Sequence, residues 1–157
     1  FRRVLFRSLF YLEISPGAGE IRWVRAGHDP ALLYDPAEDS FRQLSGDGMA
    51  LGVDKSYEYP ENVLENIGGG QILLIGTDGI WETENSHHEM FTKERLQTLM
   101  RDHADRNAEE IADAITEGVA AFRGDTPQED DITLVVIKVG VGFIESHEAE
   151  RSEEGKE

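Results

Sequence analysis

Two apolar runs, each next to an acidic turn, constrain the fold of this chain more than any other feature. The run 71–76 (QILLIG) stops two residues before Asp78, and the run 132–139 (ITLVVIKV) begins two residues after Asp130. Apolar, β-branched runs of this length predict strands that are buried on both faces. If the two strands are antiparallel neighbours, the end of one lies beside the start of the other. Asp78 and Asp130 would then come together at one edge of a sheet.

Carboxylates that approach each other repel, and each raises the pKa of the other unless a cation lies between them. A divalent ion with oxygen ligands resolves that conflict, so a metal site is one interpretation of the pattern. Gly79 follows Asp78 and would let the backbone pass close to such a site, because it has no Cβ atom. The other interpretation is ordinary turn chemistry, since Asp and Gly often flank strands.

The remaining elements predict an α+β fold with an antiparallel sheet. Short strands are expected in a meander at 9–15, 21–26, 31–34 and 41–44, with the first turn at Pro16-Gly17. Two helices are expected between the apolar runs, on one outer face of the sheet. Thr92 is expected to cap the first helix and Asn107 the second, where Glu110 would complete a capping box.

Composition narrows the possible functions. The 157 residues suit one domain, and a formal net charge of -17 argues against binding to nucleic acids or acidic membranes. No window is apolar enough for a membrane helix, which needs about 18 such residues. The absence of cysteine excludes disulfides and thiolate metal sites, and is compatible with a cytoplasmic location.

Four segments together resemble the metal-dependent protein phosphatases, also called PPM or type 2C. The run LLIGTDGIWETEN (73–85) resembles the Asp-Gly motif of that family, and EDDITLVVIKV (129–139) resembles its last motif. AGHDPALLY (26–34) and GMALGV (48–53) resemble the bacterial SpoIIE/RsbU-like branch. The four occur in the order of the family and cover residues 9–139, which makes the resemblance specific.

The resemblance implies a partial αββα sandwich with antiparallel sheets and a helix pair on one face. It implies a site for two Mn²⁺ or Mg²⁺ ions, with Asp78 and Asp130 as ligands, Gly79 beside them and Asp131 in a variable position. The implied activity is hydrolysis of phosphoserine or phosphothreonine on a protein, by in-line attack of water on phosphorus. His28 is a candidate proton donor or phosphate contact, although a locally hydrogen-bonded turn histidine is the preferred interpretation.

Composition and the resemblance together divide the chain into three parts. Residues 1–8 are interpreted as a truncated strand or a non-native leader, 9–140 as the C-terminal portion of the phosphatase domain, and 141–157 as an acidic disordered tail. The first metal motif of the family, Gly-Asp-x-x-Gly-His-Gly, would precede Leu9 and does not occur in this chain. We therefore expect weak metal affinity and little or no activity from this chain alone.

Two kinds of partner are implied by the resemblance: a phosphoprotein substrate, such as an anti-anti-sigma protein, and a sensory domain upstream in the parent protein. Two other functions remain open. The chain could be a non-catalytic, partner-binding domain with a degenerate phosphatase fold, or a plain acidic α+β binding module without catalytic ancestry.

Overall fold

The chain forms two compact units in a computed structural model that describes residues 7–15 and 18–140. The first unit is made of Phe1–Pro30, Ser45–Gln71 and Val139–Glu157, and the second of Ala31–Leu44 and Ile72–Lys138. Most of the segment interpreted as a leader, the turn at Pro16-Gly17 and the tail 141–157 lie outside the described residues. No helix in the described part is long and apolar enough to cross a membrane.

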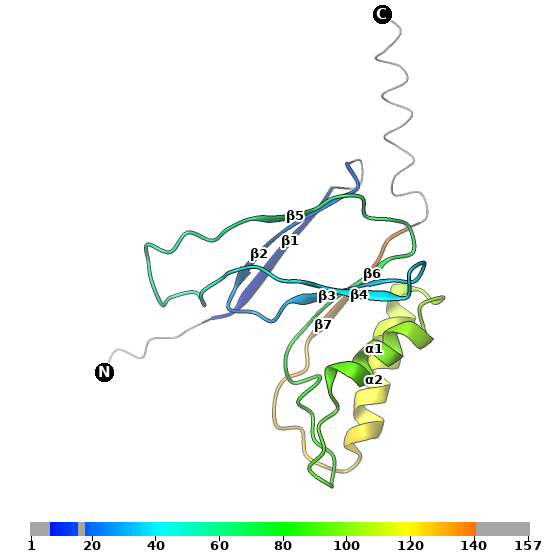
Figure 1. Ribbon diagram of the computed structural model, residues 1–157. Helices are drawn as coiled ribbons and strands as arrows, with labels where there is room; N and C mark the ends of the chain where they lie inside the picture. Colours follow the sequence, from blue (N-terminus) through cyan, green and yellow to red (C-terminus); the bar gives the residue numbers. More distant parts are fainter. Residues whose placement is uncertain (1–6, 16–17, 141–157) are drawn as a thin grey trace, which may run out of the picture. The chain divides into compact units, whose positions relative to one another are not determined.

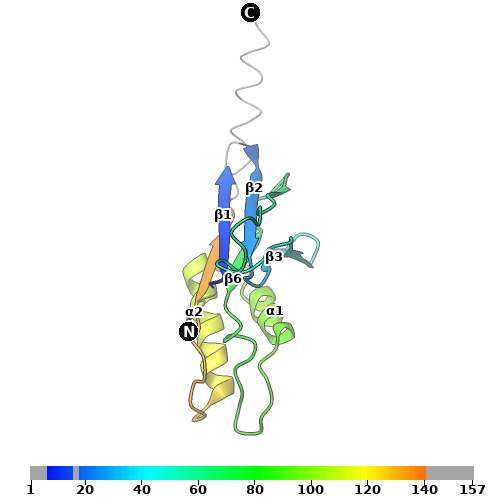
Figure 2. The same cartoon turned by 90° about the vertical axis from the view of Figure 1, so that its left-hand side faces the viewer.

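The first unit contains a three-stranded antiparallel sheet in the order β1-β2-β5. The strands are β1 (Leu9–Ser15), β2 (Glu20–Ala26) and β5 (Asn62–Leu64). β1 and β2 form the predicted hairpin and run side by side in Figure 2. β5 was not predicted from the sequence, because a three-residue strand is too short to show an alternating pattern.

The second unit contains a four-stranded antiparallel sheet in the order β4-β3-β6-β7. Its strands are β3 (Ala31–Asp35), β4 (Ser40–Leu44), β6 (Ile72–Gly76) and β7 (Leu134–Lys138). The predicted single meander is wrong, since β2 and β3 belong to different sheets and β3 pairs with β6 instead. The strand conformation is interrupted between β2 and β3 at two residues. Gly27 has a φ of 71°, which suits glycine, and Pro30 has no N–H for a sheet ladder.

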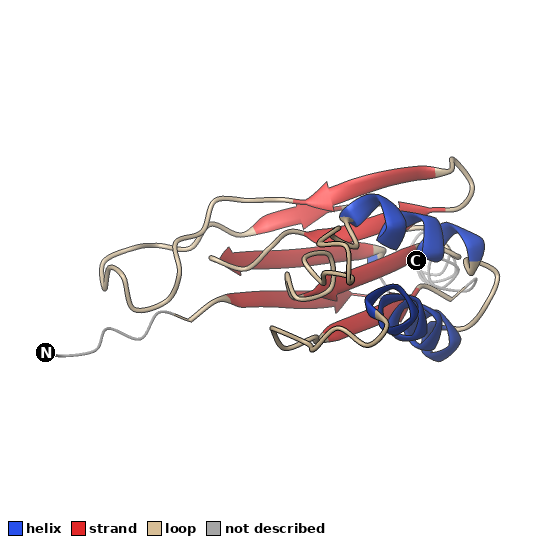
Figure 3. Cartoon of the chain, turned by 90° about the horizontal axis from the view of Figure 1, so that it is seen from below, coloured by secondary structure: helices blue, strands red, loops and turns tan. Residues whose placement is uncertain are grey.

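Two helices, α1 (Lys93–Asp102) and α2 (Ala108–Arg123), pack on one face of this second sheet and lie next to each other in Figures 1 and 3. Cross-strand partners Leu32, Leu74 and Val136 face the helices from β3, β6 and β7. The predicted helix pair on one face is thereby confirmed. The buried core residues contributed by the helices are Leu96, Met100, Ile111, Ile115 and Val119.

The two helix starts differ from each other. Asn107 forms the predicted capping box: its side chain accepts the Glu110 N–H at 2.9 Å, and the Glu110 carboxylate accepts the Asn107 N–H at 3.1 Å. Such a cap stabilises a helix by about 1 kcal/mol. The predicted side-chain cap at Thr92 is wrong, because Thr92 has φ 73° and its side chain makes no capping hydrogen bond to the first helical turn. Its side chain hydrogen-bonds Glu94 instead, which lowers the pKa of that carboxyl.

The last strand is shorter and more exposed than predicted. β7 lies at an edge of the described sheet, and its side chains alternate between partly buried and exposed near the start of the strand. Leu134 and Val136 pack against the core, whereas Val135 between them is 48% exposed. Successive side chains of a strand point to opposite faces, so an apolar run by itself does not show that both faces are covered.

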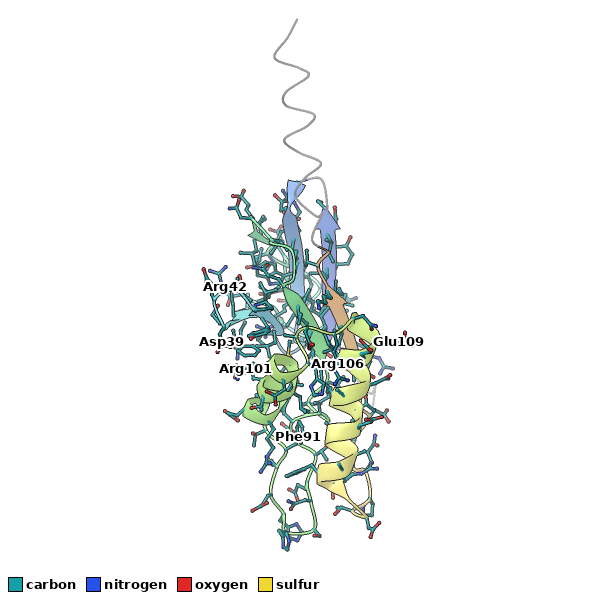
Figure 4. The ribbon with its side chains drawn as sticks, turned by 90° about the vertical axis from the view of Figure 1, so that its right-hand side faces the viewer. Asp39, Arg42, Phe91, Arg101, Arg106 and Glu109 are labelled. Atoms are coloured by element: carbon teal, nitrogen blue, oxygen red, sulfur yellow. The ribbon has the colours of Figure 1, made fainter. Side chains whose placement is uncertain are left out.

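Asp39 links the β3–β4 turn to α1 in the second unit. Its carboxylate accepts hydrogen bonds from Arg101 Nε at 2.6 Å and from the Tyr34 hydroxyl at 3.0 Å, and Figure 4 shows Asp39 beside Arg101. The bond from Arg101, and then that from Tyr34, lowers the pKa of the Asp39 carboxyl. The ionised form of Asp39 is therefore favoured in the folded protein.

We expect Asp39→Asn to lower the free energy of unfolding at pH 7 but not in acid. A group whose pKa is lowered by folding contributes stability above its unfolded pKa of about 3.9, and this contribution disappears as the pH falls through the folded value. Urea unfolding at pH 7 and at about pH 2 measures the difference. An equal loss at both pH values would show that the ionised carboxylate is not what stabilises this turn.

Candidate metal centre at the β6–β7 edge

The two acidic turns meet at one end of the β6–β7 pair. β6 and β7 are antiparallel neighbours, as predicted, with Gly76 opposite Leu134. The pairing continues past the strands, because the Thr77 N–H donates to the Thr133 carbonyl at 3.0 Å. In Figure 1 the loop that follows β6 and the loop that precedes β7 leave the same end of the sheet. The convergence expected for Asp78 and Asp130 is therefore present in the backbone.

Gly79 is in close contact with the second loop. A Cβ atom on Gly79 would lie 2.6 Å from the Asp131 carbonyl oxygen and 3.6 Å from the Asp130 carbonyl carbon. Real Cβ atoms essentially never come this close to a backbone oxygen, so glycine is the residue that allows the loops to touch. The Thr77 hydroxyl donates to the same Asp131 oxygen at 2.9 Å.

The two aspartates are held in similar ways. Oδ1 of Asp78 accepts the Gly79 N–H at 3.1 Å, and Oδ1 of Asp130 accepts the Asp131 N–H at 2.8 Å. Both residues are exposed, and no residue of the described part bonds to the second oxygen of either carboxylate. Each carboxylate is thus oriented through one oxygen, while the other oxygen faces no protein donor.

The carboxylate oxygens of Asp78 and Asp130 fit part of a site for a hard divalent cation. Carboxylate oxygens are the ligands that Mg²⁺ and Mn²⁺ prefer, and Mg²⁺ is commonly held by one or two carboxylates together with water and phosphate oxygens. Residues 7–15 and 18–140 contain no group of three or more His, Cys, Asp or Glu side chains that could hold a metal ion. Asp78 and Asp130 place two exposed carboxylates on these two loops, and Asp131 follows Asp130 on the second loop.

A hollow of about 380 Å³ opens beside this pair of loops. That volume lies within the usual range for ligand pockets, about 300–1,000 Å³. This hollow could not be predicted from the sequence, since its walls come mostly from loops that lack a periodic pattern. Its lining residues are Gly79, Glu82, Thr83, Glu84, His88, Met90, Arg123, Thr126, Pro127, Gln128, Glu129 and Asp130.

His28 belongs to the first unit and makes local contacts there. Its Nδ1 lies 3.0 Å from the Asp29 carbonyl oxygen, a contact in which the ring nitrogen donates. Its ring lies edge-on to Phe10, with centroids 6.1 Å apart, and its own carbonyl accepts from Arg25 Nε at 2.7 Å. These contacts are those of a locally hydrogen-bonded turn histidine, and the role of His28 in chemistry stays a prediction.

The AGHDP turn (26–30) and the GMALGV loop (48–53) are in contact within the first unit. The Gly27 N–H donates to the Gly48 carbonyl at 3.1 Å, so the AGHDP turn touches the GMALGV loop. Arg25 ties them further, since its guanidinium donates to the His28 carbonyl and, at 2.9 Å, to the Gly46 carbonyl. The AGHDP turn and the GMALGV loop thus have a structural role in the first unit.

Comparison with solved structures identifies the class of fold. The SiaA-PP2C domain of Pseudomonas aeruginosa matches with a TM-score of 0.66 and 24% identity, covering 77% of this chain and 47% of that one. The phosphatase domain of the cell fate determinant SpoIIE from Bacillus subtilis matches with a TM-score of 0.64 and 20% identity, covering 85% and 58%. The α+β fold of this chain is thus a part of the PP2C phosphatase fold.

Sequence comparison then gives the family. Residues 1–140 match the family model described as Stage II sporulation protein E (SpoIIE), and the chain belongs to that family. Phosphoserine phosphatase RsbU of Bacillus subtilis (strain 168) is 26% identical over 136 residues, which are 85% of this chain and 39% of the relative. The chain therefore spans about two fifths of the length of that relative and about half of the solved domains.

Proposed function

We propose that this chain is the C-terminal part of a metal-dependent serine/threonine protein phosphatase domain. The observation that carries the proposal is the contact between the Asp78-Gly79 turn and the Asp130-Asp131 loop, joined by the Thr77 hydroxyl and by the close approach of Gly79. That contact brings two loops with exposed carboxylates to one end of the β6–β7 pair, where a shared cation would balance their charge. Membership of the SpoIIE family supports the same reading.

The proposed roles follow from the position of each residue. Asp78 and Asp130 would hold Mn²⁺ or Mg²⁺ with their carboxylates, each of which is anchored to the backbone through Oδ1. Gly79 keeps the two loops in contact, and Asp131 is available as a further ligand. The hollow lined by Gly79 and Asp130 is open to the substrate residues that flank the phosphate.

A bound divalent pair supplies an activated water and neutralises the phosphate oxygens. Neutralisation matters especially in this protein, because a chain with a formal net charge of -17 repels a phosphorylated substrate. Without a bound metal ion, the carboxylates of the site would add to that repulsion. As metal ligands, they would instead hold the ions that attract the phosphate. Removal of divalent ions with a chelator is therefore expected to abolish the activity of the complete domain.

The substrate and partners belong to the same proposal. The substrate class is a phosphoserine or phosphothreonine on a signalling protein, for example an anti-anti-sigma protein, and a sensory domain upstream would control the activity. The similarity to a relative named phosphoserine phosphatase RsbU supports this choice of substrate. We further propose a cytoplasmic location, because a chain without cysteine has no dependence on an oxidising compartment.

An assay of phosphate release from a phosphoserine peptide with Mn²⁺ tests the proposal. The full-length parent protein is expected to be active, whereas this chain alone is expected to show little or no turnover, since it lacks the Gly-Asp-x-x-Gly-His-Gly motif. Robust turnover by this chain would contradict the second expectation. No turnover by either protein would favour a non-catalytic partner-binding domain instead.

A further inference from the structure

Thr77 joins the two acidic loops through both hydrogen-bonding capacities of its hydroxyl. Its Oγ1 donates to the Asp131 carbonyl at 2.9 Å and accepts the Thr133 N–H at 3.0 Å. The residues it joins are more than 50 positions apart in the sequence, so this is not a local turn interaction. One side chain thus connects the residue before Asp78 to the residue after Asp130.

The direction of these bonds matters more than their strength. They lie at an exposed edge, where water competes for both partners, and hydrogen bonds in such places contribute little to global stability. However, they fix the Asp131 carbonyl, which lies close to Gly79, and the N–H of the same residue anchors Asp130 Oδ1. The orientation of the Asp130 carboxylate therefore depends on where Thr77 holds the neighbouring backbone.

We propose that Thr77 is a positioning residue that sets the separation of the Asp78 and Asp130 carboxylates for divalent-ion binding. The inference rests on the proposed metal-dependent function and goes beyond it by assigning a role to a residue that does not bind the metal itself. Residues that orient metal ligands typically change metal affinity by about 10–100-fold when they are replaced. Thr77 is suited to this role because its Oγ1 reaches the second loop without displacing either carboxylate.

The test is a titration of the 157-residue chain with Mn²⁺ alone, followed by paramagnetic broadening of the backbone amide signals. This method detects weak binding and reports on the Asp78 and Asp130 loops separately. The variants are Thr77→Val, which removes the hydroxyl at nearly constant volume, and Thr77→Ser, which keeps it. Thr116→Val is the matched control, because the Thr116 hydroxyl also donates to a backbone carbonyl, that of Ala112 at 2.8 Å in α2.

In the wild type, both loops are expected to broaden at the same Mn²⁺ concentration. Thr77→Val is expected to raise the Mn²⁺ concentration at half-maximal broadening about tenfold, or to make the two loops broaden at different Mn²⁺ concentrations. Thr77→Ser and Thr116→Val should titrate like the wild type. Amide hydrogen exchange adds a readout without metal: the Thr133 N–H should lose protection in Thr77→Val and keep it in Thr77→Ser.

Two results would overturn the inference while leaving the metal site intact. One is a Thr77→Val titration that matches the wild type, and the other is a loss in Thr77→Ser as large as that in Thr77→Val. A wild-type chain in which neither loop broadens would instead reject the metal site itself, and the positioning role with it. The wild-type titration thus separates failure of this inference from failure of the proposed function.

Discussion

Asp78→Asn and Asp130→Asn are each expected to reduce the Mn²⁺-dependent phosphatase activity of the full-length protein by about 100-fold or more, equivalent to about 3 kcal/mol of transition-state stabilisation. Each change replaces a charged ligand by a neutral amide of the same shape. The fold should survive, because both side chains are exposed and each bonds only to the next backbone N–H. An asparagine oxygen can accept that same bond.

The measurement is the initial rate of phosphate release as a function of Mn²⁺ concentration, together with the urea midpoint of each variant. Asp113→Asn is the control, since Asp113 is an exposed aspartate on α2 and the change in formal charge is the same. Wild-type rates in Asp78→Asn and Asp130→Asn, in an enzyme that still requires Mn²⁺, would mean that the ions bind elsewhere. Loss of activity accompanied by loss of the folded state would make the effect structural.

Gly48→Ala is expected to lower the free energy of unfolding by about 3 kcal/mol, the upper end of the usual cost of overpacking. A Cβ atom at this position would lie 1.8 Å from the Arg25 carbonyl oxygen and 2.5 Å from its carbon. Both atoms belong to the backbone of β2, which pairs with β1 and cannot yield as the end of a flexible side chain would. The Gly48 carbonyl also accepts the Gly27 N–H, so a shift of the loop would break that bond.

Urea denaturation followed by circular dichroism measures this effect, with Gly68→Ala as the matched control in the same unit. A Cβ atom on Gly68 would meet no atom closer than 3.9 Å, so its replacement should change stability by no more than about 0.5 kcal/mol. Equal stabilities of Gly48→Ala and Gly68→Ala would contradict the close packing of the GMALGV loop on β2.

Much of the second unit could be predicted from local patterns. The apolar run before Asp78 is the buried strand β6, the helical periodicity and the Asn107 capping box mark α2, and the two buried runs are antiparallel neighbours. These features depend on neighbours in the sequence and on simple periodicity, which a single chain displays directly. The expected meeting of the two acidic turns followed from that pairing alone.

Other features depend on partners that are distant in sequence. β7 carries an apolar run, but Val135 within it is exposed, and β3 pairs with β6 and not with β2. Thr92 has the residue type of a helix cap, yet its backbone at φ 73° directs the side chain elsewhere. Propensity describes what a residue can do, while packing selects among those possibilities.

The sequence by itself determined the strands β6 and β7, the helix pair and the identity of the two aspartates as candidate ligands. These features depend only on residue type and on spacing along the chain. The tertiary structure alone decided how the aspartates are held. Thr77 reaches the Asp131 carbonyl, and Gly79 lies against it, only after strands more than 50 residues apart have paired. Such contacts form between atoms that no local pattern relates, so they become visible only in the folded chain.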